Sequence, residues 1–132
     1  MTIRKWFTNP FLWRLFWISW AVLIAILSFI PGDRLPVIEW DLISVDTLVH
    51  FLMYATLSFS MILGGFKKNM NLSSFNLYLI ILSAGIAYGT GIELIQGFFI
   101  YQRYFDPSDI LANTIGTIFG AVTVRLTSIK LV

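Results

Sequence analysis

The chain has 132 residues, of which 58% are hydrophobic and 12% are charged, and its formal net charge at pH 7 is +2. An ordinary soluble domain is about 45–50% apolar and about 25% charged, so this composition favours a protein solvated by lipid. The absence of cysteine excludes disulfides and thiolate metal sites, and the small net charge argues against a nucleic-acid partner.

The first predicted element covers about residues 11–30, an apolar run interrupted only by Arg14 and two serines. A helix needs about 20 apolar residues to cross the hydrocarbon core of a bilayer. A cleaved signal peptide is the alternative, but its apolar region would be shorter and a small-residue cleavage site would follow. We therefore expect a retained transmembrane helix, with Arg14 about one turn inside it and reaching back to the near interface.

Residues 31–45 begin with Pro-Gly, a helix-ending pair, and then mix acidic with apolar side chains. This pattern is typical of a segment that lies at the membrane interface, with a single helical turn at most. Three further apolar runs predict spans at about residues 47–65, 75–99 and 108–128. The connections between them are short.

The predicted fold is all-α: one domain over residues 1–132 that forms an integral membrane four-helix bundle. Four spans place both termini and the middle turn on one side of the membrane. Positive charge accumulates on the cytoplasmic side, so we expect both termini to be cytoplasmic. The predicted cytoplasmic side carries Arg4, Lys5, Arg14, Lys67, Lys68, Arg125 and Lys130 and no acid, whereas the other side carries Arg34, Arg103 and all seven acidic residues.

Polar side chains recur at the predicted extracytoplasmic ends of three helices and in the adjoining loop. They are Asp46, His50 and Tyr54; Glu93 and Gln96; Asp109 and Asn113; and Arg103. Within each helix they follow three- or four-residue spacing, which places them on one face. At 1.5 Å per residue the three sets lie at nearly the same depth. Ionisable residues within a span are costly and mark functional sites, so we expect these side chains to converge on one site.

Each residue also has an ordinary structural interpretation when it is taken singly. Asp46 and Asp109 are alternatively helix N-caps, and Gln96 and Asn113 are alternatively hydrogen-bonding groups between helices. The matched depth of several ionisable groups favours the functional interpretation.

Glycines at four-residue spacing continue two of these polar stripes towards the membrane interior. Gly85 and Gly89 precede Glu93, and Gly116 and Gly120 follow Asn113. Small residues let helices approach closely, which predicts internal packing, with a dimer contact as the alternative for Gly85 and Gly89.

These residues together resemble the VanZ-like family of small bacterial membrane proteins, over roughly residues 20–125. The similarity rests on an Asp-x-x-x-His-x-x-x-Tyr pattern beginning at Asp46 and on Glu-x-x-Gln at Glu93, followed by Arg103. Its last part is Asp-x-x-x-Asn-x-x-Gly-x-x-x-Gly beginning at Asp109. The resemblance implies a multi-pass helical protein of the bacterial cytoplasmic membrane, distantly linked to enzymes that act on lipid head groups.

The expected function is to bind or process a phosphate-bearing lipid head group or a lipid-linked cell-envelope precursor. In an enzyme, a hydrolase or transferase, His50 would be the general base or nucleophile, oriented by Asp46 or Glu93. The expected substrate-binding side chains are Arg103, Gln96, Asn113, Tyr54 and Asp109, of which the arginine suits phosphate oxygens. The family often has Lys after the first Asp of its motif, where this chain has Thr47, so one phosphate contact is missing.

The sequence does not decide whether the site binds a metal ion. Asp46, Glu93 and Asp109 would supply the oxygen ligands that Mg²⁺ and Mn²⁺ prefer. Zinc is not expected, because the chain has one histidine, no cysteine and no HExxH motif.

Two other functions remain open alternatives. A non-catalytic protein would bind a cell-wall precursor or a partner protein and modulate susceptibility to glycopeptides, as the resemblance to a teicoplanin-resistance protein implies. Ion or proton transport would use the Glu and His as a relay, but few polar residues continue the path across the membrane. The sequence leaves the oligomeric state open.

Overall fold

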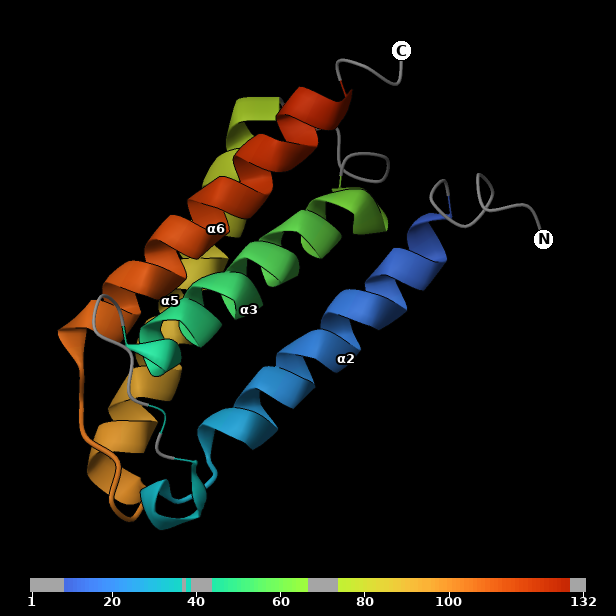
Figure 1. Cartoon of the computed structure of the whole chain (residues 1–132). Coiled ribbons are helices and arrows are strands. Elements are labelled where there is room, and N and C mark those ends of the chain that lie inside the picture. The colour runs from blue at the N-terminus through green and yellow to red at the C-terminus, as the bar shows by residue number, and fades with distance from the viewer. Residues whose placement is uncertain (1–8, 37, 39–43, 67–73, 129–132) are drawn as a thin grey trace.

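The computed structural model describes residues 9–36, 38, 44–66 and 74–128. Every regular element in this part of the chain is helical (Figure 1). The long helices are α2 (Pro10–Ser28), α3 (Val45–Met61), α5 (Ser74–Phe99) and α6 (Pro107–Ser128); η1 (Gly32–Arg34) is a 3₁₀ turn and η2 (Ile62–Phe66) is a π-helical turn that continues α3. All 4 long helices are long and apolar enough to cross a membrane, which confirms the all-α prediction.

The helix starts differ from the predicted ones by two residues at most, but the caps are different. Ser44 is the N-cap of α3, since its Oγ accepts the Thr47 N–H at 3.1 Å. At the start of α6, Asp106 Oδ1 accepts the Ser108 N–H at 2.8 Å. The interpretation of Asp46 and Asp109 as caps is therefore wrong: both lie inside the first turn of their helices, and their carboxylates face other elements.

The four helices are not equally integrated into the bundle. The α3 and α6 helices share the most extensive contact and α5 packs on α6, whereas α2 contacts mainly α3 and η2 (Figure 1). The start of α2 and the end of α6 lie at one end of the bundle, and η1 and the connection between α5 and α6 lie at the other. The described chain therefore has the predicted up-down arrangement.

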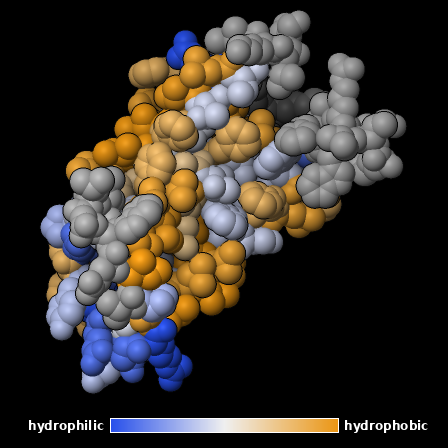
Figure 2. All heavy atoms as spheres, viewed as in Figure 1, coloured by the Kyte–Doolittle hydropathy of each residue, from blue (hydrophilic) through white to orange (hydrophobic). Residues whose placement is uncertain are grey.

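The outer surface is the one expected of a membrane protein. Large apolar side chains such as Phe11, Val22, Phe75 and Phe119 are exposed along the helices. Hydrophilic residues gather at the end that carries η1, while the flanks visible in Figure 2 are largely hydrophobic. A surface of this kind is covered by lipid rather than by water.

Glycine allows α3 and α6 to touch through their backbones. A Cβ atom at Gly116 would collide with the carbonyl oxygen of Phe51, and one at Gly120 would collide with that of Ala55. No side-chain rotation relieves such a collision, because the obstructing atoms belong to the opposing helix backbone. This close approach brings the polar groups of α3 and α6 within hydrogen-bonding distance.

The second glycine pair serves the contact between α5 and α6. A Cβ at Gly85 would meet Thr117, and one at Gly89 would lie 2.9 Å from Nδ2 of Asn113 and 3.1 Å from Cε1 of Tyr54. These glycines therefore face the interior of the bundle, and the structure favours internal packing over the dimer contact.

Four hydrogen bonds between a side chain and a backbone carbonyl join α2 to its neighbours. Arg14, which was expected to reach back to the interface, instead donates from Nε to the carbonyl of Gly64 in η2 at 2.7 Å. The other three bonds run from Trp20 Nε1 to the Met53 carbonyl, from Tyr88 Oη to the Ala21 carbonyl and from Gln96 Nε2 to the Ser28 carbonyl. These bonds fix α2 as one wall of the site described below.

The predicted orientation in the membrane remains a prediction. Arg125 lies in the last turn of α6, at the end of the bundle opposite η1 and Arg34. Most of the charges behind the prediction lie outside the described residues: Arg4, Lys5, Lys67, Lys68 and Lys130. Of the expected interfacial segment, η1 forms the single helical turn, and residues 37 and 39–43 also lie outside the described part.

Candidate functional site

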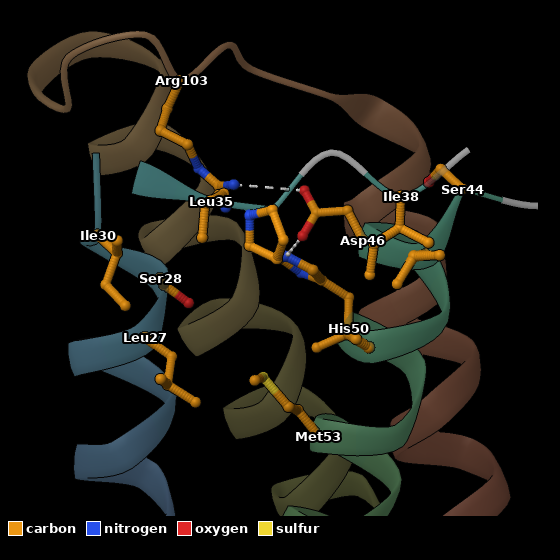
Figure 3. A pocket seen from close by; sticks show the side chains of 13 residues that line it. Leu27, Ser28, Ile30, Leu35, Ile38, Ser44, Asp46, His50, Met53 and Arg103 are labelled. Carbon is orange, nitrogen blue, oxygen red and sulfur yellow. Dashed lines mark ion pairs between the residues drawn. The ribbon is translucent and has the colours of Figure 1, made fainter. Parts of the chain in front are cut away.

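The centre of the candidate site is a chain of three charged or ionisable groups from two elements. Arg103 Nη1 lies 3.5 Å from Oδ2 of Asp46, whose Oδ1 lies 3.7 Å from Nε2 of His50 (Figure 3). The Asp46 side chain is 50% exposed, whereas those of His50 and Arg103 are only 5% and 12% exposed. Arg103 thus pairs with an acid on α3.

The tautomer of His50 is set by Asn113. Nδ1 of the ring lies 3.1 Å from Oδ1 of Asn113, in a fully buried contact between α3 and α6. An amide oxygen only accepts hydrogen bonds, so Nδ1 carries the proton and donates. In the neutral ring Nε2 is then the unprotonated nitrogen, and it faces Asp46. Asn113 and His50, which were both expected in one site, are therefore in direct contact.

A short hydroxyl relay holds Asp109. The Thr47 Oγ1 donates to Oδ1 of Asp109 at 3.0 Å, and it lies 2.6 Å from Oγ of Ser44. Because the Thr47 proton is used on Asp109, Ser44 donates to Thr47. Thr47 thus orients the buried carboxylate of Asp109.

Asp46, His50 and Asp109 form a group with metal-ligand chemistry. One ligand atom from each residue can be chosen so that all three atoms lie within 4.8 Å of one another. Asp46 and Asp109 were expected as metal ligands, whereas His50 was expected as a base. Glu93, the third expected ligand, does not belong to this group.

Glu93 instead holds the loop that carries Arg103. Its Oε1 accepts the backbone N–H of Asp106 at 2.9 Å, and the Glu93 side chain is buried. It lies close enough to His50, Arg103 and Asp109 to interact electrostatically with each of them. Glu93 is therefore a buried neighbour of the ionisable groups of the site and is not exposed to solvent.

The backbone of the α5–α6 loop is itself constrained. The N–H of Arg103 donates to the carbonyl of Ile100 at 3.2 Å, closing a turn in which Gln102 has φ 53°. A positive φ at this place is unfavourable for a residue with a side chain. The carbonyl of Tyr101 accepts the N–H of Gly32 at 3.0 Å, which joins this loop to η1. The turn thereby directs Arg103 over α3.

Gln96 and Tyr54 are buried in the bundle, away from the partly exposed Asp46. Gln96 donates to the Ser28 carbonyl, so it joins α5 to the end of α2. Tyr54 is 1% exposed, and its ring centroid lies 6.1 Å from that of Tyr88. The predicted substrate contacts of these two side chains remain untested.

A cavity of about 450 Å³ opens beside Asp46, His50 and Arg103, between the end of α2 and the start of α3 (Figure 3). Its lining combines a polar wall, formed by Asp46, His50 and Arg103, with an apolar wall formed by side chains from several elements. The lining residues are Leu27, Ser28, Ile30, Leu35, Pro36, Ile38, Ser44, Val45, Asp46, Val49, His50, Met53 and Arg103.

Sequence reasoning identified the polar wall of this cavity but not the apolar one. Leu27, Leu35, Val49 and Met53 have no sequence feature that separates them from lipid-facing residues, because both environments select apolar side chains. Of the eight predicted site residues, only Asp46, His50 and Arg103 line the cavity. Asp109 and Asn113 lie behind them as contact partners of α3 residues.

Comparison with known proteins gives one match. A family model described as VanZ/LLP1 matches residues 3–128. No curated protein and no solved structure matches the chain.

Proposed function

Because the chain belongs to the VanZ/LLP1 family of multi-pass membrane proteins, we propose that its cavity binds the phosphate-bearing head group of a membrane lipid or lipid-linked cell-envelope precursor. The observation that carries this proposal is one cavity whose lining combines the Arg103 guanidinium with many apolar side chains. The resemblance to head-group enzymes is a second, weaker support.

Arg103 is the group that would recognise phosphate. Its separation of 3.5 Å from Asp46 is longer than the about 2.7–2.9 Å of a charge-assisted hydrogen bond. The guanidinium therefore has donors that can turn to a ligand, and its planar fork suits two phosphate oxygens. Because the side chain is only 12% exposed, water screens such a contact weakly.

The apolar wall would hold the first part of the lipid chain. Leu27 and Ile30 at the end of α2 lie across from Asp46 and His50 in Figure 3, and Met53 continues the lining along α3 beyond His50. The volume of about 450 Å³ lies in the range of about 300–1,000 Å³ for small-molecule pockets. A ligand with an anionic end and an apolar end fits this lining better than a free inorganic anion does.

The proposed side of the membrane is the extracytoplasmic one. It follows from the charge distribution of the sequence, with seven basic residues on the opposite side against two on this side. The head group of an outer-leaflet lipid lies at the height of Arg103 and Asp46 in this orientation. The substrate would then enter sideways from the outer leaflet.

The test is the affinity of the protein, in nanodiscs of uncharged lipid, for a diacyl phosphate and a polyprenyl phosphate. Diacylglycerol and polyprenol are the uncharged controls. Arg103→Gln is compared with Arg34→Gln, which removes an equal charge from an exposed position in η1. Removing a partner of a buried charge pair costs about 2–5 kcal/mol, so Arg103→Gln should weaken phosphate-lipid binding at least tenfold.

The control variant Arg34→Gln should bind as the wild type does. Equal affinity of the wild type for the phosphate and alcohol forms would overturn the proposal. Equal losses in the two arginine variants would show nonspecific charge attraction, which also contradicts it.

Catalysis by His50, Glu93 and Asp46 remains a prediction. Incubating the same nanodiscs with a lipid labelled in its phosphate tests it. Turnover that disappears in His50→Gln, while binding persists, would support an enzyme. Unchanged lipid after long incubation would support the non-catalytic binding protein.

A further inference from the structure

We propose that Asp46, His50 and Asp109 form a binding site for a divalent transition-metal ion such as Mn²⁺. One ligand atom from each residue lies within 4.8 Å of the others, and Nε2 of His50 is 3.7 Å from Oδ1 of Asp46. Ligand atoms about 2.0–2.2 Å from one ion are separated by roughly 3–4 Å. A small rotation of the half-exposed Asp46 side chain closes the remaining distance.

The His50 ring is oriented as a metal ligand requires. Its Nδ1–H is donated to Asn113 at 3.1 Å, which leaves the Nε2 lone pair on the side of Asp46. Metal-bound histidines almost always donate their other ring N–H in this way, which fixes the tautomer. In the same manner, Thr47 donates to Oδ1 of Asp109 and leaves Oδ2 for an ion. Two of the three ligands thus have an outer hydrogen-bond partner.

Charge balance at the site supports a cation. Three carboxylates, those of Asp46, Glu93 and Asp109, lie together here with one guanidinium, that of Arg103, which faces Asp46 and interacts with Glu93. Glu93 and Asp109 are almost fully buried, and Oε2 of Glu93 has no hydrogen-bond partner among the described residues. Buried carboxylates need compensation, either by a cation or by protonation. One divalent ion supplies the two positive charges that the arginine does not.

The donor set determines the kind of ion. Carboxylates alone suit Mg²⁺, but an imidazole nitrogen favours transition metals. The expectation of an all-oxygen Mg²⁺ site with Glu93 is replaced here by a site with one nitrogen and two carboxylate ligands. The inference also assigns His50 a different role, since a ring bound through Nε2 is not available as a general base at that nitrogen.

The test uses Mn²⁺ alone, added to metal-stripped full-length protein in nanodiscs of uncharged lipid. Binding is followed by electron paramagnetic resonance, and electron spin echo modulation detects a directly bound ¹⁴N. We expect one Mn²⁺ per chain with ¹⁴N modulation in the wild type. His50→Gln should lose the modulation, and Asp109→Asn should bind at least tenfold more weakly. Mg²⁺ should compete poorly.

Asp33→Asn is the matched control, because Asp33 is exposed in η1 and the same charge is removed. It should bind Mn²⁺ as the wild type does. Circular dichroism checks that each variant keeps its helices. Thr47→Val is a second variant with intact ligands, and it should weaken binding by a smaller factor than Asp109→Asn.

Stoichiometric binding without ¹⁴N modulation would overturn the assignment of His50. Equal affinity of wild type and Asp109→Asn, or no stoichiometric binding, would overturn the site and favour protonated carboxyls. No lipid ligand is needed, so this result is independent of the proposed function. Arg103→Gln separates the two proposals: it should weaken phosphate-lipid binding but should not weaken Mn²⁺ binding, because it removes a positive charge beside the ligand Asp46.

Discussion

Replacing Gly116 by alanine should separate α3 from α6 and thereby disrupt the site. The new Cβ would collide with the carbonyl oxygen of Phe51, a backbone atom that cannot rotate away. Overpacking of this kind costs about 1–3 kcal/mol, and the higher helix propensity of alanine returns at most about 1 kcal/mol. The net effect should be a loss of up to about 2 kcal/mol in the free energy of unfolding.

Gly91→Ala provides a control in α5 with the opposite sign. A Cβ at Gly91 meets nothing within 4 Å, so only the propensity gain of up to about 1 kcal/mol remains. The two variants should therefore differ by about 1–3 kcal/mol, although each adds one methyl group to a helical glycine. Equilibrium unfolding in nanodiscs or mild detergent measures this difference.

The same pair of variants also tests how the site depends on packing. Asp109 and Asn113 on α6 contact Thr47 and His50 on α3. Gly116→Ala should weaken phosphate-lipid binding together with stability, and Gly91→Ala should leave binding unchanged. Equal stability of the two variants would refute the close backbone contact. Full binding by a Gly116→Ala protein that is destabilised would refute the link between that contact and the site.

Three further predictions concern the caps and the loop. Glu93→Gln keeps an acceptor for the Asp106 N–H, so this amide should stay protected from hydrogen exchange, whereas it should lose protection in Glu93→Ala. Equal protection of the Asp106 amide in both variants would contradict the anchoring role of Glu93. Ser44→Ala removes the α3 cap and should lower the free energy of unfolding by about 1 kcal/mol, measured as above, and an unchanged value would be evidence against the cap. Gln102→Gly relieves a positive φ of 53° and should raise the thermal midpoint, since the left-handed conformation costs about 1–2 kcal/mol in a non-glycine residue; a lower midpoint would contradict this interpretation.

The spans were predictable because one physical requirement dominates them. A helix that crosses lipid needs a long apolar run, and the helix starts followed the edges of those runs to within two residues. The meeting of His50 and Asn113 was also predictable, since spacing placed each on one face at equal depth. A polar side chain within a span faces the interior of the bundle, so both side chains were expected there.

Local hydrogen bonding was harder to predict. Asp46 and Ser44 are both good N-caps, and the sequence does not show which one takes the position. The role of Glu93 depends on a backbone N–H in the following loop, and backbone donors are present at almost every residue. The apolar wall of the cavity could not be predicted for a different reason. Positions that face lipid and positions that line an apolar cavity both favour apolar residues, so Leu35 and Met53 do not stand out in the sequence.

Binding of a lipid in the cavity is tested directly by photocrosslinking with a phosphate lipid that carries a diazirine on the first carbons of its chain. We expect labels on Leu35, Val49 and Met53 that disappear when an unlabelled phosphate lipid competes, and that are absent in Arg103→Gln. Labels confined to exposed outer residues such as Phe98 and Leu111, unaffected by the competitor, would contradict it.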